Sequence, residues 1–194
     1  MSKNGSRSGA SAARWIEAVL SGQGEHDDAP FILTAQLPKD MAAWATALRT
    51  EHFPPERNYL DAHVTLFHAL PRSCEAELRE CLARLAGEYA PPAGHLEGLM
   101  SLGGGTALKL TSAEMLSIRE EIADRFHGML TSQDQHKPRL HVTIQNKVTS
   151  KEAKALQARL SPEIQPRDFA FRGLALYIYR GGPWEFVRDF AFRG

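Results

Sequence analysis

The chain has 194 residues, of which 43% are hydrophobic, so it is long enough to bury one substantial core or two lobes that share a cleft. Its 23 basic and 23 acidic side chains cancel, which excludes a general electrostatic attraction to nucleic acid or membranes, so any phosphate site must be a local arrangement of donors. The sequence has no run of about 18 apolar residues and no apolar stretch in residues 1–13, so it predicts neither a membrane span nor a signal peptide, and we expect a cytoplasmic protein.

The chain divides into an extension and one domain. Residues 1–29 are rich in Ser, Gly and Ala and are predicted to form a flexible N-terminal extension, in which Trp15 to Leu20 have the spacing of a short amphipathic helix. Residues 30–194 are predicted to form the domain.

The predicted elements form two successions of the same kind. The first comprises strand 31–37, a helix capped by Asp40, strand 61–68, a helix capped by Ser73 and strand 96–102. After a Gly103-Gly104-Gly105 turn, the second comprises strand 106–110, a helix with core positions from Met115 to Phe126, strand 139–148, a helix that starts at the capping box Thr149-x-x-Glu152, and a hairpin of strands 174–180 and 184–192. This order predicts a duplicated architecture with little residue identity between its halves.

A shorter repeat is literal. Residues 167–173, Arg-Asp-Phe-Ala-Phe-Arg-Gly, recur as residues 188–194. Two strands of alternating aromatic and polar residues would produce such a copy, and so would a duplication at the end of the gene.

The strongest functional signal is a pair of His-x-Thr motifs. His63-Val64-Thr65-Leu66 recurs as His141-Val142-Thr143-Ile144, in the equivalent strand of each half. Side chains alternate across a strand, so the motif positions share one face with further residues of the same strand, and the apolar positions point into the core. The residues predicted on these two polar faces are His63, Thr65 and Phe67 in the first strand and Arg139, His141, Thr143, Gln145 and Lys147 in the second.

Two imidazoles in one cleft suit phosphodiester chemistry. A neutral histidine can remove a proton from a nucleophile while a protonated one gives a proton to the leaving oxygen. Each threonine hydroxyl can donate to a phosphate oxygen, and Arg139 or Lys147 can offset charge in the transition state. Two His and two Thr are a poor set of metal ligands, and the two cysteines are expected to be core residues, so the sequence predicts no metal and no cofactor.

At these residues the chain resembles the 2H phosphoesterase superfamily, specifically its 2′-5′ RNA ligase and cyclic phosphodiesterase branch. The similarity covers about residues 30–192 and includes the Ala62–Pro71 and His141–Val148 segments and the Tyr179-Arg180-Gly181-Gly182-Pro183-Trp184-Glu185 turn. The resemblance implies a bilobal α+β fold in which two antiparallel sheets line a central cleft and helices pack outside. It further implies that His141 activates water and His63 protonates the leaving ribose oxygen, opening a 2′,3′-cyclic phosphate to a 2′-phosphate, while Thr65 and Thr143 hold the phosphate. From the sequence alone, either histidine can be the acid and either direction, hydrolysis or ligation, is open.

The partner predicted from this chemistry is an RNA end or a small nucleotide with a cyclic phosphate, bound by a monomer. Phe67, Tyr177 and Tyr179 are candidates to stack on a base. His68 is predicted to be structural and to face away from His63. Two alternatives remain at this stage: a non-catalytic binder of nucleotides or RNA ends that uses the same cleft, and an enzyme that acts on a non-RNA cyclic phosphate.

Overall fold

A computed structural model describes residues 28–194, so the predicted extension over residues 1–29 lies outside the described chain except for its last two residues. The described residues form a first sheet with strand order β2-β1-β7-β8, a second sheet with order β5-β4-β3-β6, and four α-helices. The strands are β1 (Phe31–Gln36), β2 (Val64–Leu70), β3 (Ala93–Ser101), β4 (Thr106–Thr111), β5 (His141–Gln145), β6 (Arg167–Ala170), β7 (Gly173–Ile178) and β8 (Glu185–Ala191). The helices are α2 (Lys39–His52), α3 (Glu75–Glu88), α4 (Ala113–Arg125) and α5 (Ser150–Leu160). Every strand pair is antiparallel, which confirms the predicted α+β class.

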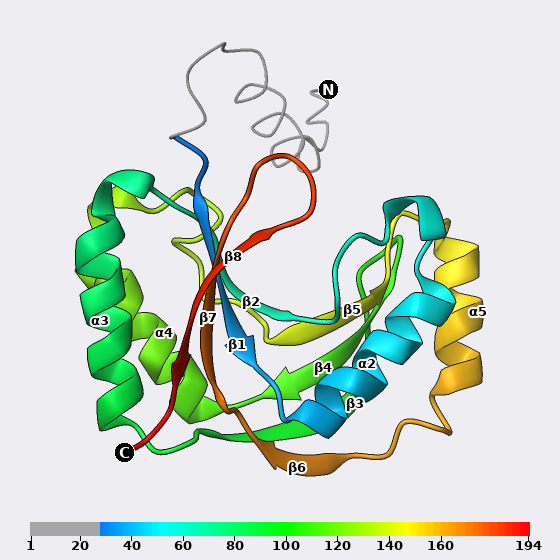
Figure 1. Ribbon diagram of the computed structural model, residues 1–194. Helices are drawn as coiled ribbons and strands as arrows, with labels where there is room; N and C mark the ends of the chain where they lie inside the picture. The colour runs from blue at the N-terminus through cyan, green and yellow to red at the C-terminus, as the bar shows by residue number, and fades with distance from the viewer. Residues whose placement is uncertain (1–27) are drawn as a thin grey trace, which may run out of the picture.

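The predicted duplication is visible in the topology. The first unit is β1-α2-β2-α3-β3 and the second is β4-α4-β5-α5-β7, but each unit places its last strand in the other unit's sheet: β3 pairs with β4, and β7 pairs with β1. Figure 1 shows α3 and α4 on one flank of the molecule and α2 and α5 on the other. Because each sheet contains strands of both units, neither half has a complete sheet by itself.

The literal repeat occupies equivalent edge strands. Its first copy forms β6, which pairs with β3, and its second copy forms the end of β8, which pairs with β7. Phe169 of the first copy lies opposite Gly94, where a Cβ atom would approach the phenylalanine ring to 2.5 Å, and Phe190 of the second lies opposite Leu174. The repeat therefore consists of two edge strands with the same place in the duplicated topology. The predicted succession of elements did not include β6, whose four residues leave little periodicity to detect.

Helix starts follow the predictions in one case of three. Thr149 and Glu152 form the predicted capping box of α5, with both reciprocal hydrogen bonds present. The predicted caps Asp40 and Ser73 are wrong. Pro38 occupies the N-cap position of α2, which places Asp40 in the first turn. Its carboxylate still interacts favourably with the helix dipole there. Ser73 lies in a short 3-10 turn that precedes α3.

The core is one cluster of buried apolar side chains that extends through both units. Cys74 and Cys81 belong to it as free thiols, as predicted, and burial raises the pKa of each. Among residues 28–194, every helix is too short or too polar to cross a membrane.

Candidate active site

The two His-x-Thr motifs lie on the facing edges of the two sheets. β2 is the outer strand of the first sheet, β5 is the outer strand of the second, and the two strands contact each other. His63 immediately precedes β2, and His141 is the first residue of β5. Thr65 and Thr143 follow two residues later and are partly buried, while the intervening valines are fully buried. The duplication therefore brings both motifs to one junction.

A β-bulge follows each motif and corrects two of the predicted site residues. Thr65 pairs with Thr34 but Phe67 pairs with Leu33, so Leu66 is an extra residue in β2. An extra residue shifts the alternation of side chains by one position. Phe67 is consequently 0% exposed in the core, and the prediction that it shares the face of His63 is wrong.

The second motif has the same bulge at the same place. Thr143 pairs with Ala107 and Gln145 pairs with Thr106, so Ile144 is the extra residue in β5. Gln145 is 8% exposed, and its side-chain oxygen accepts a hydrogen bond from the Thr106 hydroxyl. Gln145 thus packs inside the second sheet, and the prediction that it lies on the polar face is wrong for the same reason.

Both histidine rings are held in the same orientation by the main chain. His63 Nδ1 donates to the carbonyl oxygen of Asp61 at 2.7 Å, and His141 Nδ1 donates to the carbonyl oxygen of Arg139 at 2.7 Å. A carbonyl can only accept, so Nδ1 carries the hydrogen in each neutral ring. This tautomer leaves Nε2 of both rings as the nitrogen that can take up or release a proton.

The environment of His63 favours the neutral imidazole. Burial lowers the pKa of His63 from 6.5 to about 4; the hydrogen bond to Asp61 opposes this shift, and the positive charges of Arg49, His141 and His68 add to it. The contribution of His141 places the two motif histidines within electrostatic range of each other. His63 is therefore neutral near pH 7 and able to act as a base.

This pKa makes the free energy of unfolding depend on pH. Between 6.5 and about 4 the unfolded chain binds a proton at His63 and the folded chain does not, so stability is complete above pH 6.5 and is lost as the pH falls through this window. At 1.36 kcal/mol per unit the loss is on the order of 3 kcal/mol. His63→Asn keeps a donor for the Asp61 carbonyl and does not titrate. We expect wild type to lose about 2.5 kcal/mol of unfolding free energy relative to this variant, measured with urea, between pH 7 and pH 4.5, which covers about two of these units. An unchanged difference would contradict a depressed pKa.

Aromatic side chains cover His63 from the β7–β8 turn. The Trp184 ring lies 4.5 Å from the His63 ring, measured between centroids, and 5.6 Å from the Tyr177 ring. Phe186, which is 57% exposed, extends the row, with its ring 5.8 Å from that of Tyr177. Tyr179, a predicted site residue, is partly buried beyond the end of β7, where its amide donates to the Pro30 carbonyl. The sequence prediction missed Trp184 as a neighbour of the motif.

A hollow of about 870 Å³ adjoins His63 between α2 and the first sheet. His63 lines it, whereas the other three motif residues do not. Small and hydroxyl side chains of α2 line it, and so does Tyr177 of β7. Two carboxylates, Glu51 and Asp61, also line it. The polar lining residues are Thr34, Gln36, Thr46, Thr50, Glu51, Asp61, His63, Arg172 and Tyr177.

A buried arginine of α2 connects both motif strands. Arg49 is 5% exposed; its Nε donates to the Asn58 side chain at 2.8 Å and to the Leu60 carbonyl at 2.9 Å, and its NH1 donates to the Thr143 carbonyl at 2.8 Å. Its guanidinium also lies over the Phe53 ring, and burial lowers its pKa. Arg49 thus fixes the loop before the first motif against the second motif. The sequence held a signal for it, since a charged residue occurs on the apolar face of a predicted helix.

The cations near the motifs differ from those predicted. The Arg139 side chain is exposed, and Arg139 contacts His141 through its main-chain carbonyl. Lys147 is exposed beyond the end of β5 and has a positive φ of 61°. Lys109 of β4 is the strand partner of His141, so the two side chains share one face, and its ammonium group pairs with Glu97. Lys109 is therefore the cation that the sheet itself places beside a motif histidine, and only the strand register reveals it.

Within residues 28–194, no three His, Cys, Asp or Glu side chains gather in a way that could hold a metal ion. The polar groups that the fold brings to the junction are two imidazoles, each held in one orientation by a main-chain carbonyl, two hydroxyls and one nearby ammonium group.

Two His-x-Thr strands from duplicated halves that meet at one junction define the class of the 2H phosphoesterases. A family model described as the 2′-5′ RNA ligase superfamily matches residues 37–183, which include both motifs. The chain belongs to the 2′-5′ RNA ligase superfamily, within the 2H phosphoesterases. No curated protein sequence matches it.

Solved structures share the fold at low sequence identity. The protein TT0787 of Thermus thermophilus is 18% identical with a TM-score of 0.57, and the match covers 85% of this chain and 98% of that one. E. coli LigT in complex with 3′-AMP is 19% identical with a TM-score of 0.53, covering 86% and 99% of the two chains. E. coli LigT in complex with NADP+ is 17% identical with a TM-score of 0.55, covering 87% and 99%. These likenesses establish the bilobal fold.

Proposed function

We propose that this chain is a phosphoesterase that opens RNA-type 2′,3′-cyclic phosphates, or acts on 2′-5′ phosphodiesters, by acid–base catalysis between His63 and His141 and without a metal. One observation carries the proposal: two facing edge strands present equivalent imidazoles whose Nδ1 atoms are both held by main-chain carbonyls, so that both Nε2 atoms are available. The matched orientation supports a paired role, because a purely structural histidine has no need of a counterpart in the second unit.

The reaction balances with these two groups alone. One imidazole removes a proton from water as the water oxygen bonds to phosphorus, and the other donates a proton to O3′ as the P–O3′ bond breaks, which leaves a 2′-phosphate. Thr65 and Thr143 donate to the non-bridging oxygens, and Lys109 offsets the negative charge of the transition state. In the ligating direction the two imidazoles exchange roles.

The lowered pKa of His63 favours it as the base in hydrolysis, since a base must be neutral before it accepts a proton. His141 is then the acid. This assignment reverses the one that family resemblance implies, and it rests on the burial of His63 beneath Trp184.

The hollow beside His63 suits the nucleoside part of the substrate. Its volume is within the range of small-molecule sites, and its hydroxyl and amide side chains can bind a sugar or base. Among the charged side chains that line it, the two carboxylates Glu51 and Asp61 outnumber the one guanidinium, Arg172, so the hollow disfavours a further phosphate.

Adenosine 2′,3′-cyclic phosphate tests the proposal directly. We expect the purified chain to convert it to adenosine 2′-phosphate at the same rate in EDTA as without chelator, with the 2′ and 3′ products resolved by chromatography. Loss of turnover in EDTA would contradict the metal-independent mechanism. Binding of a broad panel of phosphodiesters without any turnover would instead favour a non-catalytic binder of RNA ends.

A further inference from the structure

A third histidine of β2 lies on the side of the motifs. The bulge at Leu66 directs Phe67 into the core, so the next residue, His68, points to the face of Thr65. Its side chain is 49% exposed, and its charge contributes to the lowered pKa of His63. The prediction that His68 faces away from His63 is therefore wrong.

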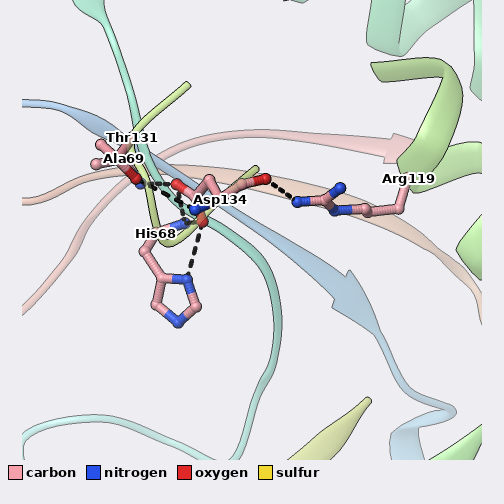
Figure 2. Close-up of polar contacts among 5 residues, drawn as sticks. All are labelled: His68, Ala69, Arg119, Thr131 and Asp134. Carbon is pink, nitrogen blue, oxygen red and sulfur yellow. Dashed lines mark hydrogen bonds and ion pairs between the residues drawn. The ribbon is translucent and has the colours of Figure 1, made fainter. Parts of the chain in front are cut away.

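A buried carboxylate fixes this ring. Asp134 is 2% exposed and accepts hydrogen bonds from the main-chain amides of His68 at 3.0 Å and Ala69 at 2.9 Å, and its Oδ1 accepts from His68 Nδ1 at 3.0 Å. Arg119 donates to the Asp134 carbonyl, and the Thr131 hydroxyl accepts from the Asp134 amide at 3.3 Å. Figure 2 shows the imidazole extending away from this cluster, so that Nε2 is at its free end.

The structural role of Asp134 accounts for only part of this arrangement. The two amides belong to an edge strand that is irregular at this point, and a carboxylate that accepts both replaces the missing strand partner. Burial alone would raise the pKa of Asp134, but the bond from the His68 ring, together with the two amide bonds, holds this pKa below its usual range. The third bond, to the ring, is not needed for the strand; its effect is to hold an imidazole in one orientation within electrostatic range of His63.

We propose that His68, oriented by Asp134, binds a second phosphate of the substrate, one nucleotide unit away from the phosphate that reacts. This inference rests on the proposed function. When the ring is protonated, Nδ1 donates to Asp134 and Nε2 carries a hydrogen that a phosphate oxygen can accept. Thr65 and His68 are three residues apart, about 10 Å along a strand and less across a bulge, which is comparable to the separation of successive phosphates in a nucleotide chain.

Charge also distinguishes the two ends of the site. The hollow on the α2 side of His63 is bordered by two carboxylates, Glu51 and Asp61, and by one guanidinium, that of Arg172, so its net charge disfavours an anion, whereas the His68 ring on β2 can donate to one. The substrate class is then a 2′,3′-cyclic phosphate whose nucleoside also bears a 5′-phosphate, as at the end of a processed RNA chain.

The test compares adenosine 2′,3′-cyclic phosphate with its 5′-phosphorylated form. His68→Asn keeps a donor for the Asp134 carboxylate and removes Nε2, so folding should be preserved. His127→Asn is the control for the loss of an exposed imidazole, because the His127 ring bonds a main-chain carbonyl, that of Asp124, outside the motifs. We expect His68→Asn to raise KM about tenfold for the 5′-phosphorylated substrate, with kcat and the unphosphorylated substrate unchanged. An equal effect on both substrates, or no effect, would overturn the second phosphate site.

Equilibrium binding separates this inference from the proposed function. Wild-type protein should bind adenosine 2′,5′-bisphosphate more tightly than adenosine 2′-phosphate, with a shift of the His68 Hε1 resonance only for the bisphosphate. If neither cyclic substrate is turned over, the proposed function is rejected, but this comparison of affinities still tests the second phosphate site. Equal affinities, with an unmoved His68 resonance, would reject the second phosphate site even if turnover is normal.

Discussion

Replacing either motif histidine by asparagine is expected to lower kcat for cyclic phosphate opening by about a thousandfold, the scale of a lost general acid or base. Asparagine retains a donor for the carbonyl of Asp61 or Arg139, so the strand should keep its structure while Nε2 is removed. Steady-state rates of His63→Asn and His141→Asn, with His127→Asn as the control, measure this directly. Rates within tenfold of wild type in either variant would rule out paired proton transfer.

An activated leaving group distinguishes the acid from the base. A 4-nitrophenolate leaving group needs no proton, so on uridine 3′-(4-nitrophenyl phosphate) the variant that lacks the acid should recover most of its rate, and the variant that lacks the base should not. In this substrate the ribose hydroxyl is the nucleophile and the nitrophenolate leaves from the position that water takes in cyclic phosphate opening, so the two imidazoles exchange roles. If His63, the histidine with the depressed pKa, is the base in opening, we expect His63→Asn to recover and His141→Asn to remain slow. Recovery of His141→Asn instead would restore the assignment that the family resemblance implies.

Substituting Arg49 by methionine is expected to have the largest effect on stability, about 3 kcal/mol, together with a fall in kcat. Methionine fills part of the space but leaves the partly buried carbonyls of Leu60 and Thr143 without their donor, and it releases the loop before His63 from the second motif. Urea unfolding and kcat of the same preparation measure the two effects.

An exposed arginine provides the matched control. Arg125 has a side chain that is 48% exposed and pairs with Glu77 on the surface, so Arg125→Met should change stability by less than about 0.5 kcal/mol. If Arg49→Met loses no more unfolding free energy than this control and keeps its kcat, Arg49 does not hold the two motifs together.

The sequence predicted the placement of the motif residues, because local pattern determines their positions. A histidine and a threonine two residues apart share a strand face in any regular strand, and the duplication placed both motifs in equivalent strands, so the four motif residues needed no tertiary information. Phe67 and Gln145 are farther along, beyond a bulge, and strict alternation assigned both to the wrong face. A bulge depends on how two strands pair, so it cannot be predicted from the residues of one strand alone.

Neighbours that come from another element were beyond sequence reasoning. Lys109 is beside His141 only because of the β4–β5 register, and Asp134 reaches His68 from a loop that is 66 residues away in the chain. Trp184 reaches His63 by the fold of the β7–β8 turn. Arg49 is the exception, since its place on the apolar face of α2 marks it as a charged residue that must find buried partners.

The most direct measurement is a crystal structure of the protein with adenosine 2′-phosphate bound. The account predicts one phosphate group at the junction of β2 and β5, with Nε2 of His63 and Nε2 of His141 each within about 3.2 Å of one of its oxygens. A phosphate bound to only one of these rings, or bound elsewhere while the two Nε2 atoms point apart, would contradict it.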